Sequence, residues 1–340
     1  MSGANGLAAF ISGCETLRLT DREKDFFREA RPCGLILFKR NCEDSAQIRA
    51  LTSEFREAVG DDRVLVLIDQ EGGRVQRLVP PHWRRYPPGR RFGDLHSRDP
   101  ARGLEAARLA ARLIARDLTD AGINVNCAPV LDLPVAGAHD IIGDRAYGMT
   151  VEAVSALGRA VAEGYLESGV LPVIKHIPGH GRACVDSHAS LPVIECTAEE
   201  LDCTDFAPFK ALSDMPLGMT AHILVPALDS ERPSSASPVI IADVIRGQIG
   251  FDGLLMCDDL GMSALSGKMK DRARAVLDAG CDVALHCSGN FAEMQDVASE
   301  APRFSGNAAR RLTAAQDRLH APLPFDEARA EELLAEALAC

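Results

Sequence analysis

Residues 64–77 read VLVLIDQEGGRVQR, and this stretch contains the pattern on which the fold prediction depends. It begins with an apolar run of strand length, 64–69, and continues directly into polar and glycine residues. A continuous apolar run bounded in this way is typical of a strand buried on both faces, as in a parallel sheet. We therefore expect the polar residues after it to lie at the carboxyl end of a buried strand.

The same apolar pattern recurs along the chain, and segments with helical length and polar faces separate its copies. Helices are expected at 45–59, 101–121, 151–168 and 268–279. Alternating strands and helices predict an α/β protein with a parallel sheet, and eight repeats favour a closed (β/α)8 TIM barrel over an open sheet. The predicted strands are 7–11, 34–38, 64–69, 123–129, 171–176, 217–222, 254–258 and 282–286.

The length of 340 residues fits a single barrel domain that covers 1–340. Its C-terminal part, from about 305 to 340, is predicted as a helical tail, and 323–340 as an acidic amphipathic helix on the outside of the barrel. No Gly-x-Gly-x-x-Gly follows the first strand, which argues against a dinucleotide site. We expect no cofactor.

The composition describes an acidic protein, with a formal net charge of -12 and a pI near 5.3. Such a charge repels phosphate backbones and anionic lipids, so neither nucleic acid nor a membrane is an expected partner. The nearest basic stretch is 84–91, where prolines and a glycine interrupt the arginines. These residues predict a solvated surface loop.

Cysteine usage and the N-terminal residues together suggest a compartment. The eleven cysteines show no CxxC spacing, and Cys127, Cys257 and Cys281 lie in apolar runs, where cysteine behaves as a small hydrophobe. Residues 1–13 have neither a basic segment nor a long apolar stretch, so we expect no signal peptide and no membrane anchor. Reduced thiols and a cytoplasmic location follow as expectations.

Polar residues come directly after several of the predicted strands, and in a barrel these strand ends converge on one face. Lys175 and His176 end the fifth strand, His222 ends the sixth, and Asp258 and Asp259 end the seventh. A carboxylate there could attack an anomeric carbon, or the aspartate pair could instead cap the next helix. Barrel geometry favours the first interpretation.

The loop after the fifth strand contains three histidines and one close carboxylate. Asp186 and His188 are two residues apart, a spacing that places both side chains on one side of an extended segment and suits proton donation by the imidazole. The alternative is that Asp186 caps a turn and His188 packs. Pro178 and Gly179 disfavour the helix that a metal-binding His176/His180 pair would need, so we expect no metal.

With these motifs, the sequence resembles the family 3 glycoside hydrolases, and most closely their bacterial single-domain β-N-acetylglucosaminidases. The resemblance rests on IDQEGGRVQR at 68–77, on KH and PGHG at 175–181, on DSH at 186–188 and on CDDL at 257–260 with Met262. Weaker similarities at 34–38 and 128–132 extend it over about residues 7 to 300.

The resemblance implies a retaining mechanism in which Asp258 forms a covalent glycosyl-enzyme intermediate and Asp259 supports it. It implies that His188 is the general acid/base and that Asp186 orients it. Arg74 and Glu71 are expected to be structural. The resemblance also implies sugar-binding roles for Asp69, Arg77, Arg145, Lys175 and His176.

The implied substrate is a small carbohydrate, because this family type removes terminal N-acetylglucosamine from anhydro-muropeptides during peptidoglycan recycling in the cytosol. Four alternatives stay open. The first is a β-glucosidase or broad glycosidase of the same family. The second is a phosphorylase, since a histidine acid/base does not repel incoming phosphate. The third, a sugar-binding protein without turnover, is disfavoured because Asp258 and His188 are both present. The fourth is a metal-dependent hydrolase, which loss of activity with a chelator would favour.

Overall fold

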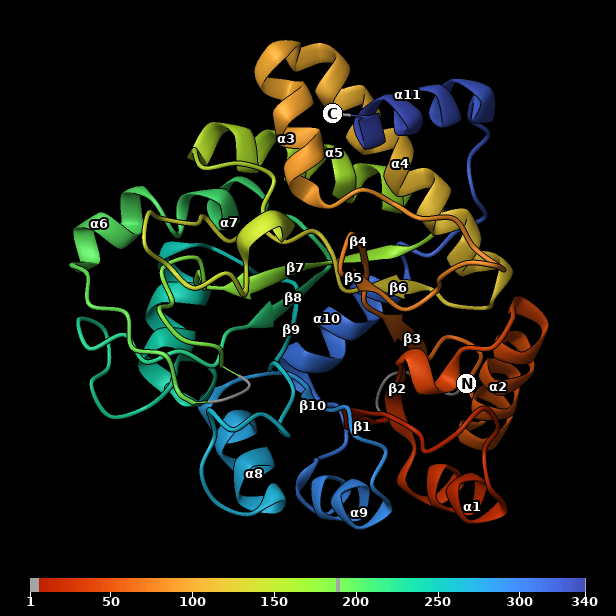
Figure 1. Cartoon of the computed structure of the whole chain (residues 1–340). Helices are drawn as coiled ribbons and strands as arrows, with labels where there is room; N and C mark the ends of the chain where they lie inside the picture. Colours follow the sequence, from red (N-terminus) through yellow and green to blue (C-terminus); the bar gives the residue numbers. More distant parts are fainter. Residues whose placement is uncertain (1–5, 188–189, 340) are drawn as a thin grey trace.

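The computed structural model of the chain describes residues 6–187 and 190–339. Within them, eight parallel strands form one sheet in the order β10-β1-β2-β3-β6-β7-β8-β9. A parallel bridge between Met256 and Val283 joins the two ends of this order, which closes the sheet into the predicted (β/α)8 barrel (Figure 1). The strands are β1 (Ala8–Ser12), β2 (Pro32–Leu37), β3 (Leu65–Ile68), β6 (Val125–Asn126), β7 (Leu171–Ile177), β8 (Leu217–Thr220), β9 (Leu254–Met256) and β10 (Ala284–His286).

Each observed barrel strand overlaps one of the predicted apolar runs, but the fourth is much shorter than expected. Residues 123–129 were predicted as a strand, and only Val125–Asn126 forms one. Pro129 has no N–H with which to continue a ladder. The chain beyond β6 instead pairs irregularly with β7, where the Val173 amide donates to Ala128 O and the Leu131 amide donates to Lys175 O.

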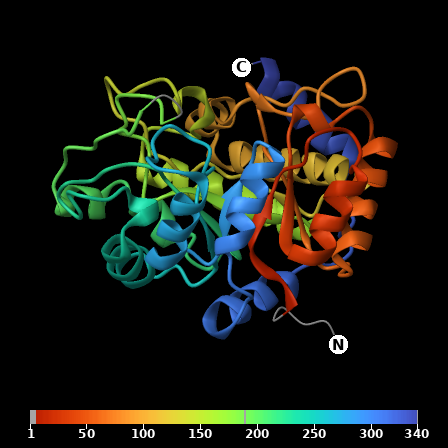
Figure 2. The ribbon, with the colours of Figure 1, turned by 90° about the horizontal axis from the view of Figure 1, so that it is seen from below.

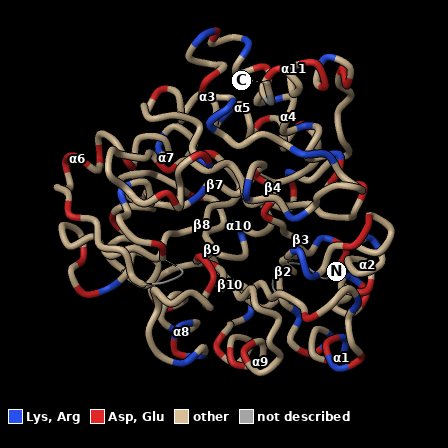
Figure 3. The backbone as a smooth tube through the Cα atoms, viewed as in Figure 1, with Lys and Arg blue, Asp and Glu red and all other residues tan. Residues whose placement is uncertain are grey.

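Helices cover the outside of the barrel and display most of the charge. The α2 helix shows how the sequence sets their limits: the Asp44 side chain caps its start, and Gly60, with φ 71°, ends it. Figure 3 shows acidic and basic residues interspersed over the outer helices. These helices are α1 (Asp21–Ala30), α2 (Ser45–Val59), α3 (Gly89–Arg98), α4 (Pro100–Asp120), α5 (Val151–Glu167), α6 (Ala198–Cys203), α7 (Ala207–Ala211), the π-helix η5 (Ile240–Gln248), α8 (Met269–Ala279) and α9 (Phe291–Glu300).

The helix α10 (Gly306–Gln316) covers the amino-terminal end of the barrel. Its Arg311 forms ion pairs with Asp252 and Asp282, which precede β9 and β10, and its Gln316 side chain donates to Arg63 O before β3. In Figure 2 the loops that follow the strands lie at the opposite end. The carboxyl ends of the strands are therefore the face on which to look for a ligand site.

The last helix, α11 (Glu327–Ala339), packs against α4 and α3 on the outside of the barrel (Figure 1). Ala330, Leu333 and Leu334 are buried against this surface. Ion pairs flank the apolar contact, among them Arg102 with Glu336 and Arg329 with Glu105. The arrangement matches the amphipathic helix predicted for 323–340, and it supports a proposal that the tail folds as part of one domain.

Truncation of Leu333 tests whether this tail contributes to the stability of the barrel. Leu333 is fully buried, so Leu333→Ala should lower the free energy of unfolding by about 2–5 kcal/mol, as removal of a buried leucine usually does. Leu323→Ala is the matched control, because that side chain is 51% exposed in the same tail. Urea titrations of both variants measure the difference; equal stabilities would show that the tail is not coupled to the barrel.

The arginine-rich stretch at 84–91 differs from the solvated loop that was predicted. Tyr86 is buried, and its hydroxyl donates to Asp117 at 2.6 Å. Trp83, just before the stretch, is also buried, and helix α3 begins at Gly89. The prediction was wrong because burial of the aromatic rings outweighs the turn tendency of the neighbouring prolines.

Two other expectations concern the cysteines and the membrane. Cys127, Cys257 and Cys281 are buried free thiols, as small apolar residues would be. Among the helices of the described ranges, none combines the length and the apolar character needed to cross a bilayer.

Candidate active site

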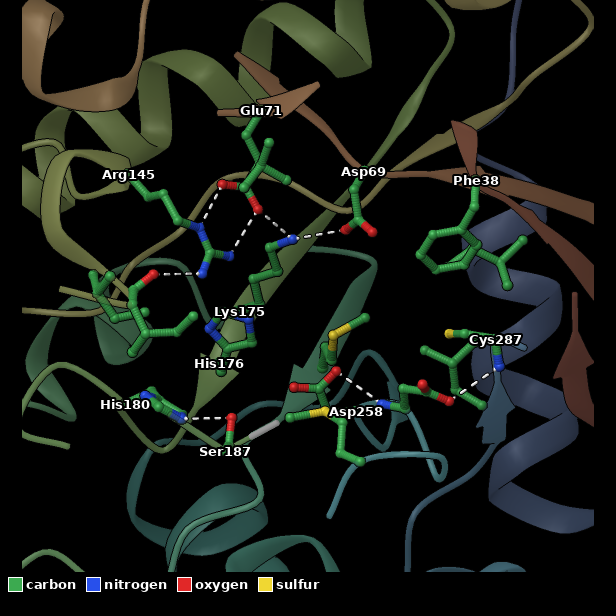
Figure 4. A pocket seen from close by; sticks show the side chains of 18 of the residues that line it. Phe38, Asp69, Glu71, Arg145, Lys175, His176, His180, Ser187, Asp258 and Cys287 are labelled. Carbon is green, nitrogen blue, oxygen red and sulfur yellow. Dashed lines mark hydrogen bonds and ion pairs between the residues drawn. The ribbon is translucent and has the colours of Figure 1, made fainter. Parts of the chain in front are cut away.

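A pocket of about 300 Å³ opens at the carboxyl ends of the strands, on the face that the sequence predicts for the site. Phe38 follows β2, Asp69 follows β3, Lys175 belongs to β7, and Cys287 follows β10, so the lining comes from strands all around the barrel (Figure 4). One part of the wall is charged and the other is apolar. The charged and polar part includes Asp69, Glu71, Arg145, Lys175, His176 and Asp258.

The hairpin after β3, formed by β4 (Gln70–Gly72) and β5 (Val75–Gln76), brings two carboxylates into the pocket. Gln70 is buried, and its side-chain oxygen accepts hydrogen bonds from the Arg77 and Leu78 amides at 2.8 and 3.0 Å. Gly73, with φ 57°, makes the turn that a residue with a side chain would strain. The fold of this short segment therefore fixes the positions of both Asp69 and Arg77.

Lys175 lies at the centre of the charged wall and joins the two carboxylates of the hairpin. Its Nζ is 3.0 Å from Asp69 Oδ1 and 2.6 Å from Glu71 Oε1 (Figure 4). Burial alone would lower the pKa of Lys175, but the charges of Asp69 and Glu71 outweigh burial and raise it above its ordinary value. The ammonium group is therefore a permanent cation in the pocket wall.

Arg145, from the loop after β6, forms a two-point ion pair with Glu71. Its Nε lies 2.8 Å from Glu71 Oε2, and its terminal Nη2 lies 2.9 Å from Oε1. The remaining terminal nitrogen donates to Ile141 O at 3.1 Å. Such fork-shaped pairs fix the plane of both groups. The guanidinium predicted to bind sugar is in the pocket, and Glu71 orients it there.

Arg77, from the same hairpin, places a second positive charge beside Asp69. Arg77 Nη2 is 3.0 Å from Asp69 Oδ2, while Lys175 holds the other carboxylate oxygen. Burial opposes ionisation of Asp69, but these two positive charges hold its pKa well below the ordinary range. Asp69 is thus an ionised acceptor at neutral pH.

A buried aspartate, Asp132, organises the histidines at the end of β7. Its Oδ2 lies 2.6 Å from His176 Nδ1, and its Oδ1 accepts the backbone amides of His176 and His180 at 3.2 and 2.7 Å. A Cβ at Gly181 would lie 2.0 Å from Leu133 O, so only glycine permits this close approach. The His176 ring therefore has a fixed orientation in the pocket wall.

Asp258 and Asp259 follow β9, and their carboxylates differ in role. The Asp259 amide donates to Asp258 Oδ1 at 2.8 Å, and the Asp258 side chain lines the pocket. The Asp259 carboxylate instead accepts the Gly261 and Cys287 amides, each at 3.0 Å. Burial opposes ionisation of Asp258, but His176, His222 and the Asp259 amide lower its pKa. Within residues 6–187 and 190–339, no hydrogen-bond donor contacts Asp258 Oδ2, so the second oxygen of this carboxylate is available to react.

His222, which the sequence placed at the end of the sixth strand, is buried behind the aspartate pair. Its Nε2 lies 3.1 Å from Asp259 O, and its Nδ1 lies 2.6 Å from Ser235 Oγ. Burial lowers the pKa of His222. The imidazole therefore supports the backbone that carries Asp258.

The loop after β7 carries the predicted acid/base, and His188 itself lies outside the described residues. Asp186 is described and half-buried, and its carbonyl accepts the Ser190 amide at 3.1 Å. The imidazole Nε2 of His180 is 3.2 Å from Oγ of Ser187, the residue that precedes the predicted acid/base in the sequence (Figure 4). Burial lowers the pKa of His180 to about 4, so this ring is neutral at neutral pH.

The buried carboxylates predict a loss of stability in acid. Although burial opposes ionisation, Arg145 and Lys175 lower the pKa of Glu71 from its ordinary 4.5 to about 2, and His176 lowers that of Asp132 from 3.8 to about 2. Between these values the unfolded chain binds more protons than the native protein, so the free energy of unfolding increases with pH. We expect it to fall from about pH 4.5 towards about pH 2. Urea midpoints that stay constant between about pH 5 and pH 3 would contradict this.

Comparison with known proteins shows the family. A family model described as the glycosyl hydrolase family 3 N terminal domain matches residues 11–320. The chain belongs to glycoside hydrolase family 3. The β-hexosaminidase of Bordetella avium is 36% identical over 299 residues, which cover 87% of this chain and 84% of that protein. The β-hexosaminidase of Chromobacterium violaceum is 38% identical over 298 residues, which cover 86% and 82% of the two chains.

Solved structures of family 3 members share the barrel. NagZ from Neisseria gonorrhoeae, in complex with N-trifluoroacetyl-D-glucosamine, matches with a TM-score of 0.85 and 29% identity over 98% of each chain. The family 3 β-N-acetylglucosaminidase from a Paenibacillus strain also matches with a TM-score of 0.85, and this chain covers 68% of it. The predictions of the barrel and of a glycoside hydrolase of the β-hexosaminidase type are confirmed.

In this family 3 chain, the structure brings most of the predicted site residues into one pocket. Asp69, Arg77, Arg145, Lys175 and His176 all line it together with Asp258. Within the described ranges, no group of three or more His, Cys, Asp and Glu side chains could hold a metal ion.

Sequence reasoning missed Asp132 as a site residue and understated Glu71. Asp132 ends a segment that follows the fourth strand, so its position after an apolar run was an available signal. Glu71, expected to be structural, pairs with two of the predicted sugar-binding cations. No pattern in the sequence indicates that pairing, because Arg145 is 74 residues away.

Proposed function

We propose that this enzyme is a retaining β-N-acetylhexosaminidase that removes terminal, β-linked N-acetylglucosamine from peptidoglycan turnover fragments. The observation that carries the mechanism is Asp258. It is an ionised carboxylate at the pocket wall, with one oxygen held by the Asp259 amide, and its other oxygen, which has no hydrogen-bond partner among the described residues, would attack an anomeric carbon. The product of that attack is a covalent glycosyl ester, which water then hydrolyses.

The general acid/base in this proposal is His188, with Asp186 as its partner. His188 lies outside the described residues, so its support comes from the sequence motif and from its neighbour Ser187, which lines the pocket. In the first step the imidazolium would give its proton to the glycosidic oxygen. In the second step the neutral imidazole would take a proton from the attacking water.

The charged wall would bind the hydroxyl groups of the terminal sugar. Asp69 offers a carboxylate with a permanently negative charge, and Lys175 and Arg77 offer cationic donors. Charge-assisted hydrogen bonds that strengthen as the oxocarbenium-like transition state forms would increase kcat rather than affinity alone. His176 and Arg145 would complete the contacts, since Asp132 and Glu71 hold both in place.

The identity of the sugar rests on the relatives. The gonococcal NagZ structure contains an N-acylated glucosamine, and the curated relatives are named β-hexosaminidases. The peptidoglycan fragment as natural substrate, and a cytoplasmic place of action, rest on the resemblance of the motifs. The proposed reaction uses no cofactor.

Hydrolysis of two aryl glycosides tests the proposal. We expect kcat/KM for an aryl β-N-acetylglucosaminide to exceed that for the aryl β-glucoside by on the order of 10²-fold or more. An active site that binds the N-acetyl group of its substrate leaves its own polar groups unpaired when the substrate lacks that group. The assay is aryl release, with sugar products analysed in the presence and absence of phosphate. Preference for the glucoside would favour a broad glycosidase, and glycosyl phosphate as the main product would favour a phosphorylase.

A further inference from the structure

We propose that Asp132 is a positioning residue that keeps a proton on Nδ1 of His176, so that Nε2 is the nitrogen presented to the ligand. Asp132 is fully buried, and it reaches His176 from the loop after β6, the neighbouring strand of the barrel. The inference rests on the sugar-binding role proposed for His176, and it assigns a role to Asp132, which lies in the similarity at 128–132 without a role there.

The geometry leaves one arrangement for the proton. The Asp132 carboxylate is ionised and carries no proton to donate, so His176 Nδ1 at 2.6 Å must be the donor. The ring is held at a second point, because its own backbone amide donates to the other oxygen of the same carboxylate. Within residues 6–187 and 190–339, no side chain or backbone group forms a hydrogen bond with Nε2.

The groups around the imidazole show why a dedicated partner is needed. Asp258 and the His180 ring, whose centroid lies 5.8 Å away, both face it within the pocket, and Lys175 is its neighbour on β7. Among the described residues, Asp132 is the group that forms a hydrogen bond with this ring and so fixes which nitrogen carries the proton. If His176 exchanged tautomers, its Nε2 would be a hydrogen-bond donor to the sugar in some protein molecules and an acceptor in others.

The variant Asp132→Asn reverses this arrangement without removing the packing. Oδ1 accepts two backbone amides, at 3.2 and 2.7 Å, so the amide oxygen of the asparagine must occupy that position. Its NH2 group then faces His176 Nδ1 and donates to it. The ring is forced to place its proton on Nε2, while the turn from 176 to 180 keeps both of its backbone hydrogen bonds.

Nitrogen NMR of histidine-labelled protein measures the tautomer directly. The chain has nine histidines, and the His176 signals are identified by their absence in His176→Gln. Wild-type spectra, without substrate, should show a protonated Nδ1 on His176. Asp132→Asn should show an unprotonated Nδ1 and a protonated Nε2, and kcat/KM for the aryl N-acetylglucosaminide should fall by on the order of 10²-fold.

Three results would overturn the inference: an unprotonated Nδ1 in the wild type, a wild-type tautomer in Asp132→Asn, or an exchanged tautomer with undiminished kcat/KM. If the variant fails to fold, the wild-type spectrum alone still shows whether His176 Nδ1 carries a proton. Because the spectra are recorded without substrate, they test the Asp132 contact independently of which glycoside the enzyme hydrolyses. A preference for another sugar would therefore contradict the proposed function and leave the tautomer result intact.

Discussion

Replacing Asp258 with alanine should lower kcat/KM for an aryl N-acetylglucosaminide by on the order of 10⁴-fold or more, because the nucleophile and its covalent intermediate are both lost. Asp258→Ala should also lower the stability somewhat while the protein stays folded, because His176, His222 and the Asp259 amide favour the ionised carboxylate more than burial opposes it. Initial rates of aryl release from the aryl N-acetylglucosaminide give kcat/KM, and a thermal melt shows whether the variant is folded.

The neighbouring aspartate provides a matched control. The Asp259 carboxylate accepts two backbone amides through a single oxygen, Oδ1, and an asparagine can offer the same oxygen to both. We therefore expect Asp259→Asn to retain kcat/KM within about 10-fold of the wild type, since bonds to the same acceptor atom are kept. If Asp259→Asn lost as much activity as Asp258→Ala, the nucleophile would not be assignable to Asp258.

Replacing Glu71 with alanine should have the largest effect on stability. Glu71 and its partner Arg145 have side chains only 8% and 11% exposed, and Lys175 is 2% exposed. Removing one member of a buried ion pair leaves an uncompensated buried charge, which costs about 3–5 kcal/mol. Activity should fall as well, because Arg145 loses the carboxylate that orients it and Lys175 loses one of its two carboxylate partners. Urea unfolding and aryl release measure the two effects separately.

Arg74 is the matched control in the same hairpin. It pairs with Asp140 across an exposed surface, where the two side chains are 40% and 84% exposed. Exposed ion pairs of this kind contribute about 0–1 kcal/mol, so Arg74→Ala should leave the free energy of unfolding near that of the wild type. Equal destabilisation by Glu71→Ala and Arg74→Ala would contradict the importance given to the buried pair.

Most of the fold could be predicted because its signals are local. The helix α2 was predicted with its observed bounds, since Asp44 supplies a start signal and Gly60 a stop signal. The fourth strand was predicted too long because an apolar run does not reveal that Pro129 ends regular pairing. Tyr86 was misplaced because its burial is a tertiary contact, and Asp117, which accepts the hydrogen bond of its hydroxyl, lies 31 residues away.

The site could be predicted only as far as strand ends define it. Lys175 and Asp258 follow from the barrel, because the carboxyl ends of its strands meet on one face. The pairing of Glu71 with Arg145 and that of Asp132 with His176 depend on how loops from different strands approach each other. Neither spacing nor residue type specifies that approach, so these contacts become visible only in the folded chain.

Trapping the covalent intermediate tests the central claim most directly. An aryl 5-fluoro-β-N-acetylglucosaminide with an activated leaving group should inactivate the enzyme in a time-dependent manner. The fluorine slows both steps through their oxocarbenium-like transition states, and the good leaving group keeps formation of the glycosyl ester faster than its hydrolysis. Proteolysis and mass spectrometry should then locate one N-acylated fluorosugar on Asp258. A label on Asp259 or another residue, or turnover without any covalent adduct, would contradict the account.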